Sequence, residues 1–160
     1  MYKRQIWTCE EEGKIANGQV LIHDGKIVAV GKDLRWAELL PKGTGEPTRM
    51  NARGKHVTPG VIDEHSHIAL RSVNEGAQAS SAEVREGDVI DAEDINIYRQ
   101  LAGGVTAAQL LHGSANPIGG QSSLIIMRWG VTPEEMKIED APGFVKFALG
   151  ENVKQANWGD

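Results

Sequence analysis

Val57-Thr58-Pro59-Gly60-Val61-Ile62-Asp63-Glu64-His65-Ser66-His67 is the stretch of this chain that decides its fold. An apolar run is interrupted by a Pro-Gly pair, resumes for two residues and ends in His-x-His. Residues i and i+2 of a strand point to the same face, so His65 and His67 would project together from one strand end, while Glu64 and Ser66 point away. This spacing predicts that two imidazoles are offered to one metal ion.

A His-x-His pair by itself also occurs by accident, since histidine is common at protein surfaces. Here the pair follows an apolar strand and a Pro-Gly break, and a long extended segment comes after it. Asp63 stands two residues before His65 and shares its parity, which suits a carboxylate that orients the pair rather than a catalytic base. The setting therefore favours a metal site.

The part of the chain before this stretch reads as a small, mostly antiparallel sheet. Two apolar runs, 18–22 and 26–30, flank His23-Asp24-Gly25, and Asp-Gly between strand-like runs predicts a hairpin because glycine accepts a positive φ. Further short strands are expected at 6–9, 48–51 and 55–57, with one or two helical turns at 34–40.

After Pro59, strands alternate with helical or loop crossovers, which indicates parallel βα units. We expect a helix that begins near Asp91 as N-cap and ends at Gly103-Gly104, and a short helix after Thr132. A full (β/α)₈ barrel needs about 250 residues, or about 31 per unit, so the residues after Val57 hold three or four units. Buried strands are expected at 61–63, 105–112, 123–129 and 144–149.

Three more positions near strand ends carry chemistry. Lys146 lies in an apolar strand, where a buried ammonium is costly, so it is either functional or a lysine whose head reaches solvent. His112 follows a strand and is either a hydrogen-bonded histidine in a rigid turn or a ligand. Gly120 and Gln121 lie in a loop that favours substrate contact, although no lysine follows with phosphate-loop spacing.

Residues 59–67 resemble the first-strand signature of the amidohydrolase superfamily of metal-dependent hydrolases, and residues 18–31 resemble the strands that precede the barrel there. The likeness extends from about Ile6 to the end of the chain. It implies an α/β protein, with part of a small β-sandwich over 6–57 and the first half of a (β/α)₈ TIM-type barrel over 58–160.

The same resemblance implies a ligand set. In the imidazolonepropionase-like and dipeptidase-like branches, a lysine in the position of Lys146 is carboxylated and bridges two metal ions. Glu151 is the alternative metal ligand, because other branches use a glutamate at the end of this strand and often bind one metal ion. His65, His67 and Lys146 are thus the implied metal ligands, with Glu151, His112 and Asp63 as second-choice ligands or supporting residues.

The implied function is hydrolysis of an amide or other C–N bond of a small molecule or peptide, with one or two divalent ions, zinc by preference. The catalytic carboxylate of the family, an Asp after the last barrel strand, lies outside this chain, so the chain alone is expected to be inactive. The alternatives are a mononuclear deacetylase or deaminase of the same superfamily, and a non-catalytic barrel homologue that serves as a binding or assembly subunit.

Composition sets the remaining expectations. A net charge of −5 without a basic stripe excludes a typical nucleic-acid binder, and no apolar run reaches the length of a membrane span. One cysteine, Cys9, excludes an internal disulfide framework. Residues 1–5 resemble a translated adapter sequence, so we expect a fragment whose native N-terminus is missing; the compartment stays unknown, with cytoplasm slightly preferred, and the full-length protein is expected to form a homo-oligomer.

Overall fold

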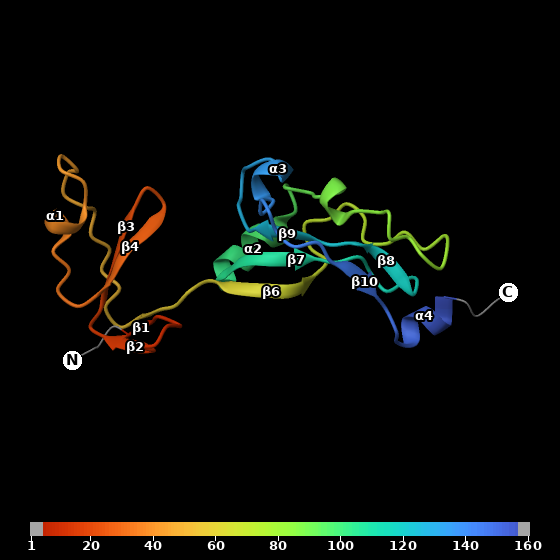
Figure 1. Ribbon diagram of the computed structural model, residues 1–160, viewed down its shortest axis with the longest axis horizontal. Coiled ribbons are helices and arrows are strands. Elements are labelled where there is room, and N and C mark those ends of the chain that lie inside the picture. The colour runs from red at the N-terminus through yellow and green to blue at the C-terminus, as the bar shows by residue number, and fades with distance from the viewer. Residues whose placement is uncertain (1–4, 157–160) are drawn as a thin grey trace. The chain divides into compact units, whose positions relative to one another are not determined.

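The computed structural model describes residues 5–156, which form a mixed α/β structure with small sheets. The chain divides into two compact units, unit 1 (Met1–Pro59) and unit 2 (Gly60–Asp160) (Figure 1). The adapter-like segment 1–5 falls outside the described residues except for Gln5, which begins the first strand. No helix in the described range 5–156 is long and apolar enough to cross a membrane.

Unit 1 holds two small sheets. β1 (Gln5–Trp7) pairs antiparallel with β2 (Lys14–Ala16) and parallel with β5 (His56–Val57). β3 (Gln19–His23) and β4 (Lys26–Gly31) form the expected hairpin, whose turn residues Asp24 and Gly25 have φ of 48° and 71°. Helix α1 (Trp36–Leu39) is shorter than expected, and residues 48–51 carry no strand.

Unit 2 is built on a three-stranded sheet. β6 (Val61–Ser66) pairs parallel with β7 (Val105–Leu110), as the βα pattern predicts, and the helix between them, α2 (Ile95–Gly103), packs beside β7 (Figure 1). β9 (Ser123–Ile126) pairs with the other edge of β7, but antiparallel. The expectation of uniformly parallel strands is wrong here, because the connection from β7 to β9 contains a strand and no crossover helix.

Two further strands make a separate sheet. β8 (Ile118–Gln121), within the expected loop 113–121, pairs antiparallel with β10 (Val145–Phe147). The expected buried strand 144–149 is therefore a short strand with Val145 and Phe147 on the surface. β6 is not buried either: it has one strand neighbour, and Ile62 is 73% exposed. In the described structure both segments are sheet edges, which the apolar pattern alone does not distinguish from central strands.

Short helices complete unit 2: η1 (Glu86–Asp88), α3 (Pro133–Met136) and α4 (Glu151–Ala156), the last of which the sequence pattern does not predict. α3 begins with the expected Thr132 cap, which forms a capping box with Glu135. The N-cap of α2 is Asp94, not Asp91, since the Asp94 side chain accepts the backbone N–H of Asn96.

The core of unit 2 lies between the sheet, α2 and α3. Its fully buried members include Ile97 from α2, Leu110 from β7 and Met136 from α3. At the surface beside this core, the rings of Tyr98 and Trp129 meet edge to face, with centroids 5.9 Å apart. The carboxyl ends of β6 and β7, which lie side by side, carry the candidate site.

Candidate functional site

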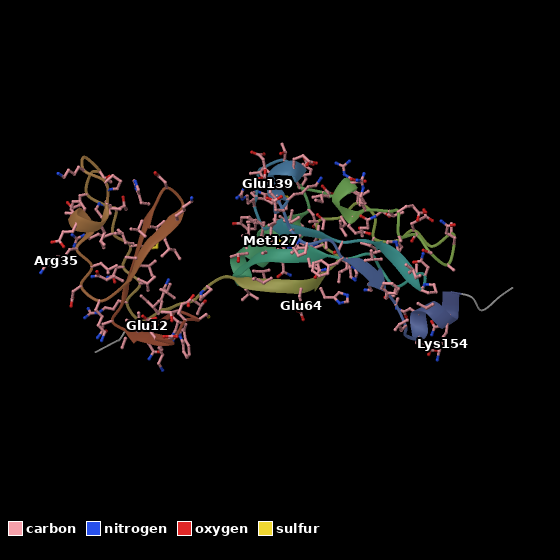
Figure 2. The ribbon with its side chains drawn as sticks, viewed as in Figure 1. Glu12, Arg35, Glu64, Met127, Glu139 and Lys154 are labelled. Carbon is pink, nitrogen blue, oxygen red and sulfur yellow. The ribbon has the colours of Figure 1, made fainter. Side chains whose placement is uncertain are left out.

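His65 and His67 stand together at the carboxyl end of β6. Their ring centroids are 5.2 Å apart and the ring planes are nearly perpendicular, at 81°. Both residues are exposed, and Glu64 projects from β6 away from the rest of unit 2 (Figure 2). The alternation expected from parity is only partly kept, because Ser66 is buried and the β6–β7 register shifts between Asp63 and Ser66. The structure nevertheless brings the two imidazoles together.

One hydrogen bond selects the tautomer of the neutral His67 ring. Its Nδ1 lies 2.7 Å from the carbonyl oxygen of Leu111 at the end of β7. A carbonyl oxygen only accepts, so Nδ1 carries a proton, and in the neutral ring Nε2 is then the nitrogen with the lone pair. This is the arrangement that metal-binding histidines adopt, with the second ring nitrogen bonded to a backbone carbonyl.

Asp63 acts on the backbone beside the pair. Its Oδ1 accepts the backbone N–H of His65 at 3.2 Å. The Asp63 carboxylate therefore restricts the backbone conformation at the end of β6. Among the described residues, the structure records no bond from it to a histidine ring nitrogen. The bond to the His65 N–H restricts the backbone torsion angles of His65 and thereby the position of its Cβ.

The described residues supply two ligands of a metal site rather than a full set. Within residues 5–156, no group of three His, Cys, Asp or Glu side chains is arranged to hold a metal ion. Structural and catalytic zinc sites use at least three protein ligands. The chemistry of the exposed pair fits a divalent ion, since imidazole with a free nitrogen is a common zinc ligand, and further donors are required.

The two strand-four candidates lie in different surroundings. Lys146 is half-buried on β10, in the sheet with β8 and not in the sheet that ends in the histidine pair. Glu151 is exposed in the first turn of α4, and its carboxylate lies 3.9 Å from the Lys154 ammonium on the same helix. Glu151 is thus part of a surface ion pair.

His112 is fully buried just after β7 and uses both ring nitrogens on the backbone. Nε2 accepts the N–H of Glu75 at 2.8 Å, and Nδ1 lies 2.9 Å from the carbonyl oxygen of Gly113. Since an N–H only donates and a carbonyl only accepts, the ring is neutral with its proton on Nδ1. The geometry corresponds to the hydrogen-bonded histidine of the two alternatives.

Gly120 and Gln121 lie on β8, close to the same histidine. A Cβ on Gly120 would lie 2.9 Å from the carbonyl oxygen of Val84, so only glycine fits there without a shift. The Gln121 side-chain amide donates to the Ala82 carbonyl oxygen at 2.8 Å, and its backbone N–H donates to Val84. In this structure the two residues bind the segment 82–84.

A buried polar cluster that the sequence patterns do not predict surrounds the peptide of Glu75. The Glu75 carbonyl oxygen accepts hydrogen bonds from Asn116 Nδ2 and Ser81 Oγ, each at 3.0 Å, and both side chains are buried. Polar residues in a polar loop carry no periodic signal, so burial of Asn116 and Ser81 was not deducible from spacing. The cluster ties the long segment after β6 to the end of β7.

Glu86 in η1 is a further buried residue that the sequence patterns do not predict. Its side chain is 1% exposed, and Oε2 has no hydrogen-bond partner among the described residues. Burial raises the pKa of the Glu86 carboxyl; a positive charge on His112 would lower it by a smaller amount, and that opposing effect is absent while the His112 ring is neutral. A carboxyl in this position favours its neutral form.

Known proteins resemble the chain over part of their length. No protein-family model matches it. The imidazolonepropionase of Geobacillus thermodenitrificans is 44% identical over 61 residues, which is 38% of this chain and 14% of the relative. The amidohydrolase tasK of Hapsidospora irregularis is 28% identical over 158 residues, which covers 88% of this chain and 16% of the relative.

One solved structure matches nearly the whole chain. The crystal structure of an amidohydrolase from Thermotoga maritima superposes with a TM-score of 0.70 and 29% sequence identity, over 96% of this chain and 41% of that one. The chain thus spans less than half of that structure and about one-seventh of the length of the curated relatives.

Proposed function

Since the chain belongs to the amidohydrolase superfamily by its sequence and structural likeness, we propose that it is part of a metal-dependent hydrolase that cleaves an amide or related C–N bond. The observation that carries the proposal is the exposed His65–His67 pair, with rings 5.2 Å apart and His67 Nε2 left free by its bond to Leu111. Unit 1 would be part of a β-sandwich, and unit 2 the first strands of a barrel.

His65 and His67 would hold a divalent ion, zinc by the nature of the donors. Such an ion supplies Lewis-acid chemistry and lowers the pKa of a water bound to it. The chain's own residues orient the site: the Leu111 carbonyl fixes the His67 ring, and Asp63 holds the backbone of His65. The first contact holds the His67 ring and the second holds the backbone of His65 before any ion binds.

Lys146, as a carbamate, is the proposed ligand from β10. Its half-buried position supports this choice over Glu151, which is exposed and ion-paired to Lys154. Lys146→Ala in the complete protein should therefore abolish hydrolysis, while Glu151→Ala keeps it. The opposite result would indicate the mononuclear alternative.

The test of the metal site is the double variant His65→Ala with His67→Ala in the complete protein. We expect its zinc content, measured by elemental mass spectrometry, to fall to the background level and hydrolysis of amide substrates to fall by more than about 100-fold, beyond the loss from an outer partner. His23→Ala, at the end of β3 in unit 1, is the matched control and should keep both. Stoichiometric zinc in the double variant would refute the proposal.

A further inference from the structure

The peptide unit that joins Leu111 to His112 links the candidate metal site to the buried polar cluster. Its carbonyl oxygen accepts the His67 Nδ1 proton at 2.7 Å. We propose that His112 is a positioning residue for His67: by anchoring this peptide unit, it keeps His67 Nε2 directed toward the metal. The inference rests on the proposed function and assigns His112 no contact with the ion or substrate.

Backbone pairing fixes one side of this connection. The Leu111 N–H donates to the Ser66 carbonyl oxygen at 3.0 Å, and Ser66 and Leu110 are paired in the β6–β7 ladder. His67 follows Ser66 directly, so the ladder brings its ring within reach of Leu111. The ladder ends there, and the plane of the next peptide depends on what holds His112.

Hydrogen bonds and close packing hold the His112 side chain in place. Its two ring nitrogens bond to Glu75 and Gly113, and the side chain is 0% exposed. A Cβ on Gly119 would lie 2.6 Å from His112 Nδ1, so the β8 backbone packs directly against the ring. A ring held in this way has no alternative rotamer without loss of buried hydrogen bonds.

The partner of His112 is itself held. The Glu75 carbonyl oxygen accepts from both Asn116 and Ser81, and the Gly113 N–H donates to the Val73 carbonyl oxygen. His112 thus binds Glu75, a residue whose backbone N–H and carbonyl oxygen are both hydrogen-bonded. Asn116 Oδ1 is a buried atom of this cluster without a partner in the described structure, but each group on the path from His112 through Glu75 to Asn116 Nδ2 and Ser81 is bonded, and such bonds orient the groups that they join.

The test measures Co²⁺ binding to the complete protein by its visible absorption. His112→Leu keeps the side-chain volume and removes both ring nitrogens, while His112→Gln keeps a polar group that can accept from Glu75. We expect the dissociation constant for Co²⁺ to rise about 10- to 100-fold in His112→Leu and less in His112→Gln, with an altered absorption spectrum at saturating Co²⁺. A structural role alone would not produce this graded change.

Ile97→Val is the matched control, because it shortens a core side chain in the same unit without touching the site. It should lower Tm while Co²⁺ binds as in the wild type. If His112→Leu does not fold, the Co²⁺ affinity and spectrum of His112→Gln are compared with those of Ile97→Val instead. A folded His112 variant that keeps the wild-type affinity for Co²⁺ and the wild-type spectrum would overturn this inference but not the proposed function. If the wild-type protein binds no more Co²⁺ than the His65→Ala/His67→Ala variant, both the proposed function and this inference are overturned.

Discussion

Glu86 shows that a single buried carboxyl can couple the stability of unit 2 to pH. Its side chain is 1% exposed, and Oε2 lacks a partner in the described structure. Burial raises its pKa, so the folded protein pays for ionisation that the unfolded chain accepts freely. This cost is present above the raised pKa and disappears as pH falls toward 4.5, the value for an unperturbed glutamate.

The first prediction is that Glu86→Gln stabilises the protein at neutral pH. Gln keeps the shape and the unpaired polar group but cannot ionise, so the desolvation penalty of the carboxylate is removed and the free energy of unfolding should rise by about 1 kcal/mol. The gain should shrink as pH falls from about 7.5 to 4.5. Urea unfolding followed by circular dichroism measures both values.

Glu139→Gln is the control for this prediction, since Glu139 is an exposed carboxylate of the same unit (Figure 2). Its effect on stability should be small at both pH values. A Glu86→Gln variant whose gain does not change with pH would show that the benefit comes from packing rather than from the lost charge.

Residue-level reasoning found the histidine pair for a physical reason and missed its surroundings for another. The parity of a strand relates positions two apart, so His65 and His67 are expected together from the sequence alone. The contact of His67 with Leu111 joins residues 44 apart, and that of Asn116 with Ser81 joins residues 35 apart. No local pattern encodes such pairs, so the supporting cluster required the structure.

At the scale of elements, Asp94 connects the start of α2 with the segment after β6. Oδ1 caps the helix by accepting the Asn96 N–H at 2.9 Å, and Oδ2 accepts the N–H of the fully buried Ala69 at 2.8 Å. One carboxylate thus satisfies a helix terminus and a buried backbone donor. Asp91, the N-cap expected from the sequence, accepts the Glu93 N–H in the preceding turn.

We therefore predict that Asp94→Ala destabilises the protein by about 2 to 4 kcal/mol, from a lost cap and an unsatisfied buried N–H. Asp91→Ala, the matched control three residues earlier, should cost about 1 kcal/mol or less. Chemical denaturation of both variants measures the difference. Equal losses would mean that the helix begins at the position that the sequence pattern favours.

The sequence predicts most of the helices and strands, but less of how the strands pair and in which direction they run. The β3–β4 hairpin was expected because Asp24-Gly25 supplies two residues that accept a positive φ, and α3 because Thr132 and Pro133 mark a helix start. The antiparallel direction of β9 was not expected. Strand direction depends on how the chain returns between β7 and β9, and apolar periodicity is the same in both directions.

At the scale of the whole molecule, the division at Pro59 and Gly60 separates two compact units. The buried hydrophobic cluster that contains Ile97 consists of unit 2 residues. When two units fold as separate cooperative regions, a cavity in one core leaves the other protected.

The prediction at this scale is that Ile97→Ala raises hydrogen exchange only in unit 2. The cavity should cost about 2 to 5 kcal/mol, and exchange measured by mass spectrometry should increase in peptides within 60–156. Peptides of the β3–β4 hairpin serve as the internal control and should exchange as in the wild type. Equal increases in both units would show one cooperative structure.

The edge-to-face contact of Tyr98 with Trp129 has an optical consequence. Tyrosine transfers excitation energy to a nearby indole, so light absorbed by Tyr98 is emitted by Trp129 while α2 stays docked beside the turn that follows β9. With the other tryptophans, Trp7, Trp36 and Trp158, and the second tyrosine, Tyr2, replaced by phenylalanine, Trp129 emission that is excited through tyrosine would report on that single contact. Energy transfer from Tyr98 to Trp129 thus measures whether α2 is packed against this turn.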